Sequence, residues 1–331
     1  MTMSEELRLC MIGAGGHSER NIYPSLFRLR GETAVVAACD LDVARAARMA
    51  ARHGIPASYG DHQAMLDALS PDGVIICVGP DGHAKLAAEL LDRGLHVYTE
   101  KPNATSLAQS LTVVAAQKRA DRVCMVGYKK RFAPAYVKTK AILGAKDFGQ
   151  AVGMNVIRSC GGRGVPAENL RPHLLDWTCH TLDLSCFLLG PVRRVFARLC
   201  PGERYALSVV LTHCNGAVGH QLFTNAPAAA EEQVYITGTG GVTVRVANSI
   251  EMLALRGDQP FAAHRPSFTT GNSFSDIEQG FAGELKEFVA AIRENRRPES
   301  DITQATHTLA VFEAMWQSSQ TDLEVHVEYQ P

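Results

Sequence analysis

Short apolar runs of the β type alternate with amphipathic helical stretches from Leu7 to Gly127, and no other feature of the sequence restricts the fold as strongly. Strands that alternate with helices form βαβ units, in which the helices cover a parallel sheet. The expected strands are LRLCMI (7–12), TAVVAAC (33–39), GVIICV (73–78), LHVYT (95–99) and RVCMVG (122–127). The expected helices cover 41–53, 82–93 and 107–119. We therefore predict a doubly wound α/β domain over residues 1–127.

The pattern changes after residue 127 to longer segments in which apolar and polar residues alternate. Such alternation is typical of a mostly antiparallel sheet with one covered face. The segments are QAVGMNVIRS (150–159), RRVFARL (193–199), YALSVVLTH (205–213), AVGHQLFTN (217–225), QVYITG (233–238), VTVRV (242–246) and LEVHVEY (323–329). Helices are expected over 172–189, 277–294 and 303–318, and a loop over 226–232. We predict a second α/β domain over residues 128–331 with a large open sheet.

Length and charge limit the classes of function. A chain of 331 residues exceeds the size at which one hydrophobic core usually keeps growing, so two domains are favoured. Lys and Arg total 33 against 34 Asp and Glu, and a net charge of -1 offers no basic stripe for nucleic acid. Glu5 and Glu6 stand where a signal peptide would be positive, and no stretch approaches the roughly 20 apolar residues of a membrane span. We expect a cytoplasmic protein without nucleic-acid or membrane partners.

The cysteines fit a reducing compartment. There are nine of them and no CxxC pair, which argues against a structural zinc site or a thioredoxin-type redox pair. Four lie in apolar runs and are expected to act as small buried hydrophobes: Cys10, Cys39, Cys77 and Cys124.

A glycine-rich segment, GAGGHS (13–18), directly follows the first strand and opens a helix. Gly13 permits a tight turn, and Gly15 lets the backbone approach a pyrophosphate at the positive end of the helix. Ser18 replaces the third glycine of the usual fingerprint, and a small side chain there still allows close packing. The segment predicts a dinucleotide site of the Rossmann type, although a simple glycine-rich turn is the alternative.

Asp40 ends the second strand, where a carboxylate can accept hydrogen bonds from both ribose hydroxyls of an adenosine. The alternative is an N-cap for the helix that follows directly. Asp40 and nearby Asp42 would repel a 2′-phosphate, so NAD is expected as the cofactor and NADP is less favoured.

Lys101 follows the fifth strand in the segment Glu100-Lys101-Pro102. In open α/β sheets this edge binds ligands, and a cation there can stabilise a developing alkoxide. Pro102 biases Lys101 away from helix and so gives it a defined direction. A surface lysine paired with Glu100 is the alternative.

The segment DWTCHTLD (176–183) is expected on a helix, where Asp176, His180 and Asp183 share one face. A carboxylate beside an imidazole orients the ring and supports its protonated form, which suits a general base. An ordinary ion pair on a helix face is the alternative. A metal site that also used His173 and Cys179 is disfavoured, because neighbouring Cys179 and His180 point about 100° apart on a helix. No metal is predicted.

Taken in order, these segments resemble the glucose-fructose oxidoreductase and inositol dehydrogenase family, often called Gfo/Idh/MocA. The resemblance also rests on GPDGHAKLAAELLDRGLHVYTEKP (79–102), GYKKRF (127–132) and FAGELKEFVAAIRENRRP (281–298). It implies a Rossmann domain followed by an α/β domain whose open sheet commonly mediates oligomerisation. It also implies that Lys101, Asp176 and His180 form a catalytic triad and that Asp183 lies near the substrate. The sequence departs from the family at Trp-Thr-Cys (177–179) and at RGVPAENLRPHLL (163–175), which leaves substrate identity open.

Together these features predict an NAD-dependent oxidoreductase that moves a hydride between nicotinamide and a CH–OH carbon of a sugar, sugar acid or cyclitol. The alternatives are a ligand sensor of the same fold and a biosynthetic ketone or imine reductase. Either His180 or Lys101 is the proton acceptor. The expected cofactor residues are Gly13, Gly15, Gly16, His17, Ser18, Asp40, Pro80, His83, Glu100 and Lys101. The candidate substrate residues are Tyr128, Arg131, Arg163, Arg171 and Asp183. A structural role is equally open for Tyr128 and Arg131, and a surface role for Arg163 and Arg171. A homodimer or homotetramer is expected to form through the second sheet.

Overall fold

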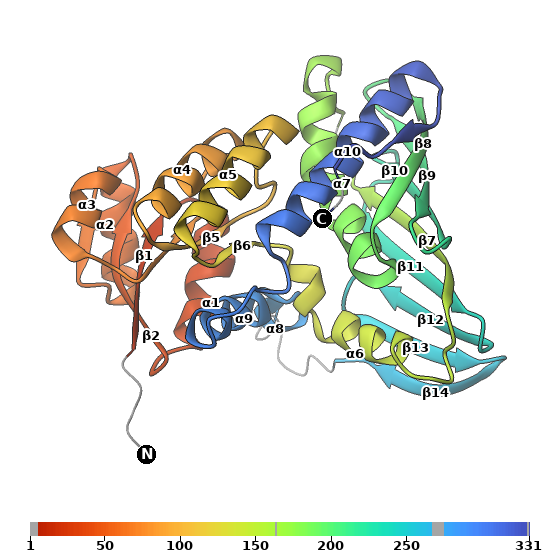
Figure 1. The fold of residues 1–331 in the computed structure, drawn as a ribbon, viewed down its shortest axis with the longest axis horizontal. Coiled ribbons are helices and arrows are strands. Elements are labelled where there is room, and N and C mark those ends of the chain that lie inside the picture. The colour runs from red at the N-terminus through yellow and green to blue at the C-terminus, as the bar shows by residue number, and fades with distance from the viewer. Residues whose placement is uncertain (1–5, 163, 267–274, 330) are drawn as a thin grey trace. The chain divides into compact units, whose positions relative to one another are not determined.

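A computed structural model describes residues 6–162, 164–266, 275–329 and 331 (Figure 1). The chain forms two compact units. The first contains Met1–Lys129 and Phe281–Ala305, and the second contains Lys130–Gly280 and Thr306–Pro331. The sequence prediction placed a single boundary between residues 127 and 128, whereas the chain returns to the first unit for the segment 281–305.

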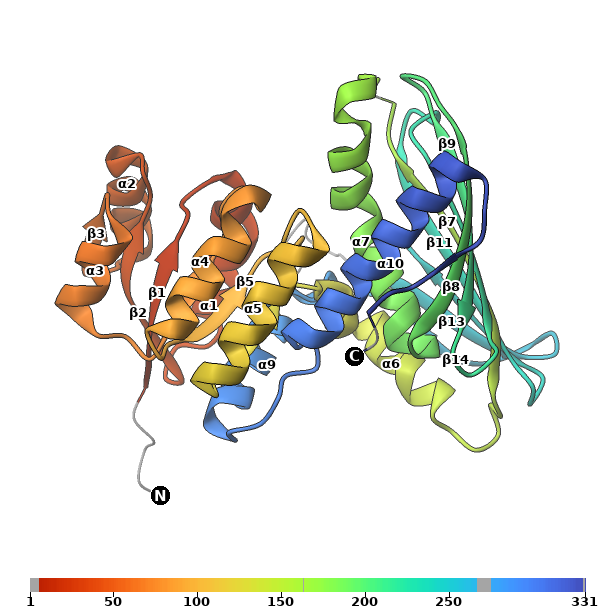
Figure 2. The same cartoon turned by 45° about the horizontal axis from the view of Figure 1, so that its top comes forward.

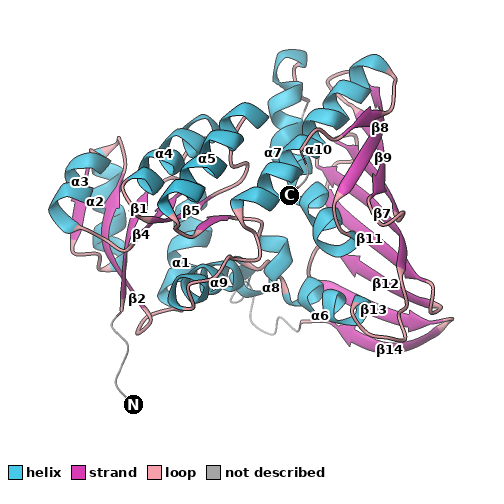
Figure 3. Cartoon of the chain, in the orientation of Figure 1, coloured by secondary structure: helices cyan, strands magenta, loops and turns pink. Residues whose placement is uncertain are grey.

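The first unit contains a six-stranded parallel sheet with the strand order β3-β2-β1-β4-β5-β6. This is the strand order of a dinucleotide-binding Rossmann sheet, so the predicted doubly wound fold is confirmed. Figure 3 shows helices and strands of the chain in separate colours. The strands are β1 (Leu7–Ile12), β2 (Thr33–Cys39), β3 (Ala57–Tyr59), β4 (Gly73–Ile76), β5 (His96–Thr99) and β6 (Cys124–Val126). The central strands are apolar because helices cover both faces of a parallel sheet.

The buried cysteines of this sheet behave as small hydrophobes, as predicted. Cys10 and Cys124 are fully buried, and Cys39 is nearly so. Burial raises the pKa of the Cys10 thiol to about 12 and that of Cys39 to about 11. These thiols therefore stay protonated and unreactive at neutral pH.

The helices of the first unit begin and end at recognisable signals. They are η1 (Ser18–Ile22), α1 (Tyr23–Phe27), α2 (Val43–His53), α3 (His62–Leu69), α4 (Pro80–Asp92), α5 (Leu107–Ala120) and α9 (Phe281–Arg293). Side chains of Asp42, Asp61 and Ser106 cap α2, α3 and α5 by accepting a backbone N–H three residues later. The sequence reasoning did not identify β3 and α3, which are only three and eight residues long.

The late segment joins the first unit through the edge strand β6. The Val126 N–H donates to the Ser300 carbonyl at 2.9 Å, and the Ser300 hydroxyl donates to the Val126 carbonyl at 2.7 Å. From α9, Phe288 packs edge-on against Tyr98 of β5, with ring centroids 5.9 Å apart. These contacts satisfy backbone groups that an open edge would leave exposed. An amphipathic pattern cannot show which of two domains a helix covers, so the sequence assigned this helix to the second.

The second unit is built on a nine-stranded sheet with the order β14-β13-β12-β11-β7-β10-β9-β8-β15. All neighbours are antiparallel except β7 and β10, so the predicted mostly antiparallel sheet is confirmed. The strands are β7 (Ala151–Cys160), β8 (Val192–Cys200), β9 (Ala206–His213), β10 (Val218–Thr224), β11 (Ala230–Gly238), β12 (Val242–Ala247), β13 (Glu251–Arg256), β14 (Gln259–His264) and β15 (Val325–His326).

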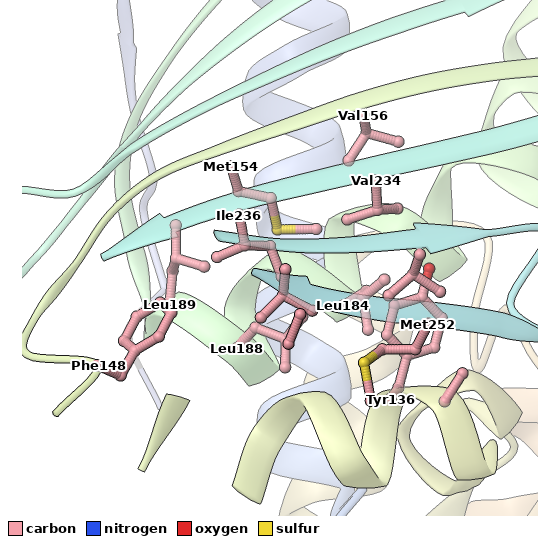
Figure 4. Packing of buried hydrophobic residues seen from close by; sticks show 14 of the residues in the cluster. Tyr136, Phe148, Met154, Val156, Leu184, Leu188, Leu189, Val234, Ile236 and Met252 are labelled. Atoms are coloured by element: carbon pink, nitrogen blue, oxygen red, sulfur yellow. The ribbon is translucent and has the colours of Figure 1, made fainter. Parts of the chain in front are cut away.

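Helices cover one face of this sheet and leave the other open (Figure 2). Helices α7 (Leu170–Leu189) and α10 (Ile302–Thr321) lie along it, and α6 (Pro134–Leu143) contacts β12 and β13. Figure 4 shows Leu184 and Leu188 of α7 packed among inward-facing residues of β7 and β11. Shorter helical turns are η2 (Lys129–Phe132), η3 (Ala167–Asn169) and α8 (Ser275–Glu278).

One prediction for this unit was wrong in detail, and two of its strands were missed. The segment 226–232 was expected to be a loop, but β11 begins at Ala230 because Ala230–Glu232 extend the pairing with β7. Strands β13 and β14 were not predicted. None of the helices in the described part of the chain is long and apolar enough to cross a membrane.

Candidate active site

The loop after β1 has the backbone shape that a dinucleotide site requires. Gly13 has φ +106°, and a Cβ on it would lie 2.0 Å from the Cys77 carbonyl oxygen, so only glycine fits. A Cβ on Gly15 would meet nothing within 4 Å. Gly15 therefore faces open space, where a pyrophosphate could approach the backbone, and the loop fits the adenine dinucleotide that its sequence predicts.

Ser18 fixes the start of the helix that follows this loop. Its hydroxyl donates to the Gly15 carbonyl at 2.8 Å, and the Glu19 N–H donates to the same oxygen at 2.9 Å. Ser18 is fully buried. A small residue thus keeps the close packing that the third glycine of the fingerprint would allow.

Asp40 connects the end of β2 to the glycine loop. Its carboxylate accepts the Ala14 N–H at 2.8 Å and the Asp42 N–H at 2.9 Å, and an Arg45 nitrogen lies 3.6 Å away. The N-cap of α2 is Asp42, so the alternative N-cap role for Asp40 is wrong. A carboxylate has about four lone-pair sites, which leaves Asp40 capacity for ribose hydroxyls.

His17 contacts the strand that leads to Lys101. Its Nε2 lies 3.3 Å from Oε1 of Glu100, and its ring meets Phe281 of α9 edge-on at 5.6 Å. The glycine loop and the end of β5 are therefore linked by a side-chain contact within the first unit.

Glu100 and Glu284 form a buried acidic pair in this unit. Burial raises the pKa of Glu100, but the His17 hydrogen bond and the nearby charges of His17 and Lys101 outweigh it and hold the pKa below its usual value. Burial and the Glu100 charge raise the pKa of Glu284 well above its usual value. We therefore assign the charge to Glu100 and a proton to Glu284. The sequence reasoning missed Glu284, although it lies on the apolar stripe of α9 with Phe281 and Phe288.

Lys101 follows β5 at the carboxyl edge of the parallel sheet, as predicted. Its N–H donates to Glu100 at 3.2 Å. Next to it, the Pro102 carbonyl accepts a 2.7 Å hydrogen bond from Nδ1 of His83, a buried residue of α4. Burial lowers the pKa of His83, so the ring is neutral and carries its proton on Nδ1. His83, expected to contact the cofactor, thus supports the Lys101 segment, and Pro80 begins α4.

The predicted helix containing Asp176 and His180 is α7 of the second unit. Because Asp176 and His180 are four residues apart on this helix, Asp176 lies one turn before His180. His180 is 7% exposed, and Asp176 is half-buried. Gln221 of β10 fixes the helix by donating to the Thr181 carbonyl at 3.1 Å and the Ser185 hydroxyl at 2.7 Å.

Two residues expected near the substrate bind each other. Arg131 donates to both oxygens of Asp183, at 2.8 and 2.6 Å, and Thr308 donates to the same carboxylate at 3.3 Å. Burial raises the pKa of Asp183, and the Arg131 charge opposes this. Asp183 is fully buried and Arg131 is 2% exposed, so we assign this pair to holding α7 in place. Tyr128 is also buried, at 1% exposure.

The remaining substrate candidates are arginines. Arg171 donates to both oxygens of Glu313, at 2.8 and 2.9 Å, which accounts for its charge without a substrate anion. Arg163 lies outside the described residues.

A buried ionic cluster around Glu232 was not predicted. Lys130 is ion-paired with it, the hydroxyls of Tyr136 and Ser249 donate to it at 3.0 and 2.8 Å, and Arg158 lies 3.5 Å away. Burial raises the pKa of Glu232, but the charges of Lys130 and Arg158 outweigh it and hold the pKa at about 2. The sequence did contain a signal, because Glu232 occupies an inward position in the alternation of β11. Within the described ranges, no three His, Cys, Asp or Glu side chains lie together as metal ligands would.

Comparison with known proteins agrees with the fold of both units. Residues 7–128 match the family model described as "Oxidoreductase family, NAD-binding Rossmann fold", and residues 165–327 match "Oxidoreductase family, C-terminal alpha/beta domain". The chain is 29% identical to the oxidoreductase YceM of Salmonella typhimurium, over 95% of this chain and 98% of that protein. It is 26% identical to D-xylose 1-dehydrogenase (NADP(+)) 2 of Haloferax volcanii, over 96% and 99% of the two chains.

The fold is also that of a solved structure, a dehydrogenase from Chromobacterium violaceum. The TM-score is 0.89 at 23% identity, and the match covers 96% of this chain and 97% of the other. Both family models match in sequence order, and the first unit has the Rossmann strand order with a glycine loop that is hydrogen-bonded to Asp40. This chain therefore belongs to the Gfo/Idh/MocA family of oxidoreductases.

Proposed function

We propose that this protein is an NAD-dependent dehydrogenase that oxidises a CH–OH carbon of a sugar, sugar acid or cyclitol. One observation carries the proposal: the open backbone at Gly15, the carboxylate of Asp40 and Lys101 all follow strands at the carboxyl edge of one parallel sheet. Ligands of open α/β sheets bind at this edge. The family relationship supports the same class of reaction, and the D-xylose dehydrogenase is a relative named for a sugar.

Each residue has a defined task in this proposal. The Gly13 loop and Asp40 hold NAD, which supplies a hydride acceptor when bound. His180 removes the hydroxyl proton, and Lys101 stabilises the negative charge that develops on the oxygen. Lys101 is the alternative proton acceptor. Asp176 is a positioning residue that orients the His180 ring from the preceding helical turn.

The preference for NAD follows from the charges near Asp40. Arg45 lies 3.6 Å from Asp40 and 3.4 Å from Asp42, so the three side chains together carry one net negative charge. A 2′-phosphate there would be repelled by up to about 4 kcal/mol per close charge at an effective dielectric of about 20. We expect kcat/KM to favour NAD, and Asp40→Ser to shift the ratio toward NADP because the remaining pair of Arg45 and Asp42 carries no net charge. A wild-type preference for NADP would refute this role of Asp40.

The activity is tested by following NAD reduction with a panel of cyclitols, aldoses and sugar acids, and NADH oxidation with the corresponding ketones. We expect turnover in at least one class, lost in Lys101→Met. If no compound turned over in either direction, a ligand sensor of the same fold would be the better description.

We also place assembly of the cytoplasmic enzyme on the open sheet face. Four exposed apolar side chains lie on this face, on adjacent strands: Ile157, Val210, Val218 and Tyr235. Exposed apolar side chains gathered on one face of an open sheet suit a surface that a second copy covers. Sedimentation should give a dimer or tetramer, and Ile157→Asp should dissociate it. A monomeric wild type would contradict this assignment.

A further inference from the structure

A cavity of about 730 Å³ lies within the second unit, where β7 ends and α7 begins. Its wall includes two side chains of α7, His173 and Trp177, together with Cys160 at the end of β7 and Arg204. None of these residues has a task in the proposed reaction. The cavity falls in the range of about 300–1,000 Å³ that is typical of small-molecule sites.

The cavity lies along the same helix as the reacting residues. His173, Trp177 and His180 are spaced four and three residues apart, so they follow one face of α7. At 1.5 Å per residue, Trp177 is about 4.5 Å and His173 about 10 Å from His180 along the helix axis. The cavity and His180 therefore lie along the same face of α7.

Trp177 presents a large aromatic surface that is held from two sides. The Arg158 guanidinium lies 5.1 Å from the ring centre, and the His173 ring lies 6.1 Å away. Arg158 is in turn held near Glu232, whose carboxylate also binds Lys130. The buried ionic cluster thus fixes the indole at the cavity wall. A fixed aromatic ring is suited to stacking against the apolar face of another ring.

Among the described residues of this region, neutral polar groups that could bind hydroxyl groups lie together. His173 Nε2 and the Tyr205 hydroxyl are 3.0 Å apart, and the Cys160 sulfur lies 3.7 Å from each. Burial lowers the pKa of His173 and raises that of Tyr205, so both are neutral near pH 7. Arg158 lies 3.5 Å from Glu232, which it shares with Lys130, and Arg204 already donates to the Asn225 carbonyl at 3.0 Å.

We propose that this cavity is a subsite for a second, non-reacting sugar ring, stacked on Trp177 and hydrogen-bonded by His173, whose ring is held by the buried Tyr205 hydroxyl. The substrate is then a glycoside or disaccharide whose reacting ring lies at His180. This deepens the proposed function and rests on it for the position of the reacting ring. It also accounts for the aromatic residue between Asp176 and His180, where the sequence departs from its family.

The first test measures the fluorescence emission of Trp177 and does not depend on catalytic turnover. The chain has two tryptophans, so Trp316→Phe leaves Trp177 as the only indole. In this variant, saturated with NAD, titration with maltose, cellobiose and lactose should give a saturable change in tryptophan emission for at least one of them. The reciprocal variant Trp177→Phe reports Trp316 of α10 and should show no such change. A flat titration with all three sugars, or an equal change in both variants, would overturn the subsite.

The second test separates the subsite from the reaction. We compare kcat/KM for the best disaccharide with that for its monosaccharide. Trp177→Ala should lower this ratio roughly tenfold, mainly by raising the KM for the disaccharide. Trp177→Phe should retain most of the ratio, and Trp316→Phe should have the wild-type ratio. Monosaccharide oxidation with an unchanged ratio in Trp177→Ala would refute the subsite and leave the dehydrogenase intact. No oxidation of any sugar would refute the proposed function, while the emission titration would still decide the subsite.

Discussion

The glycine loop at 13–18 of the first unit and helix α7 of the second unit both contain residues assigned to the proposed reaction, and these residues are specified in different ways. In the loop, function depends on the backbone: a positive φ at Gly13, open space at Gly15 and a carbonyl bound by Ser18. In α7, Asp183 takes its role from Arg131, a partner 52 residues away in the chain. A backbone-specified site can be recognised from a short motif, whereas a site specified by side-chain partners cannot.

The largest expected effect separates chemistry from cofactor binding. Lys101→Met and His180→Ala should each lower kcat by about 10²- to 10⁴-fold, because both act on the reacting oxygen or its proton. The Kd for NADH, measured by fluorescence, should change only a few fold, because neither residue holds the adenosine half. Near-normal kcat in His180→Ala would show that another group takes the proton.

The next test breaks the glycine loop in two ways. Gly13→Ala should destabilise the protein by about 2 kcal/mol or more, because its Cβ would lie 2.0 Å from the Cys77 carbonyl oxygen. Gly15→Ala is the matched control, since its Cβ meets nothing within 4 Å. It should leave the denaturation midpoint unchanged and raise the Kd for NAD about tenfold by obstructing the pyrophosphate. Equal NAD affinity in Gly15→Ala and wild type would place the pyrophosphate elsewhere.

A smaller effect on catalysis is expected when Asp176 is replaced, and this variant tests only the residues of α7. Asp176→Asn should lower kcat about tenfold and move the acidic limb of the kcat/KM profile for alcohol oxidation to lower pH. The reason is that the imidazole releases its proton more readily without a neighbouring carboxylate. A limb that stays in place or moves to higher pH would make Asp176 structural.

The smallest expected effect is on the stability of the folded protein in acid. It is tested by comparing two histidines of the second unit. His307 is buried, accepts the Val192 N–H at 3.0 Å and donates to the Tyr329 carbonyl at 2.7 Å, so it must be neutral. Burial lowers its pKa in the folded state. The unfolded chain then binds more protons, and the free energy of unfolding falls as pH drops below about 6.5, by at most about 1.4 kcal/mol per pH unit.

His307→Gln should flatten this slope between pH 7 and pH 5, as measured by urea denaturation at each pH. His326→Gln provides the control, because His326 is exposed and its surroundings change little on unfolding. An unchanged slope in His307→Gln would mean that other groups dominate the acid response. His83, with its pKa lowered by burial, is the corresponding histidine of the first unit.

Much of the fold could be predicted from the periodicity of apolar residues. The elements that were missed or misassigned have physical reasons. β1 and β2 were predicted at their observed bounds because a strand buried on both faces is a continuous apolar run. β14 was not recognised, because four of its six residues are exposed and its alternation is weak. α9 was found as a helix but assigned to the wrong unit, since its apolar stripe is the same whichever domain it covers.

The candidate site also has features that the sequence predicted and features that it did not. The sequence by itself determined the turn at Gly13, the position of Asp40 at the end of β2, that of Lys101 at the end of β5, and the helical spacing of Asp176 and His180. These depend on conformational preferences and spacings that act over a few residues. Only the tertiary structure decided that Arg131 and Asp183 bind each other, that Arg171 binds Glu313, that Glu284 lies beside Glu100, and that Trp177 lines a cavity. Charge pairing and burial depend on which distant residues the fold brings within a few ångströms, and no local pattern records that distance.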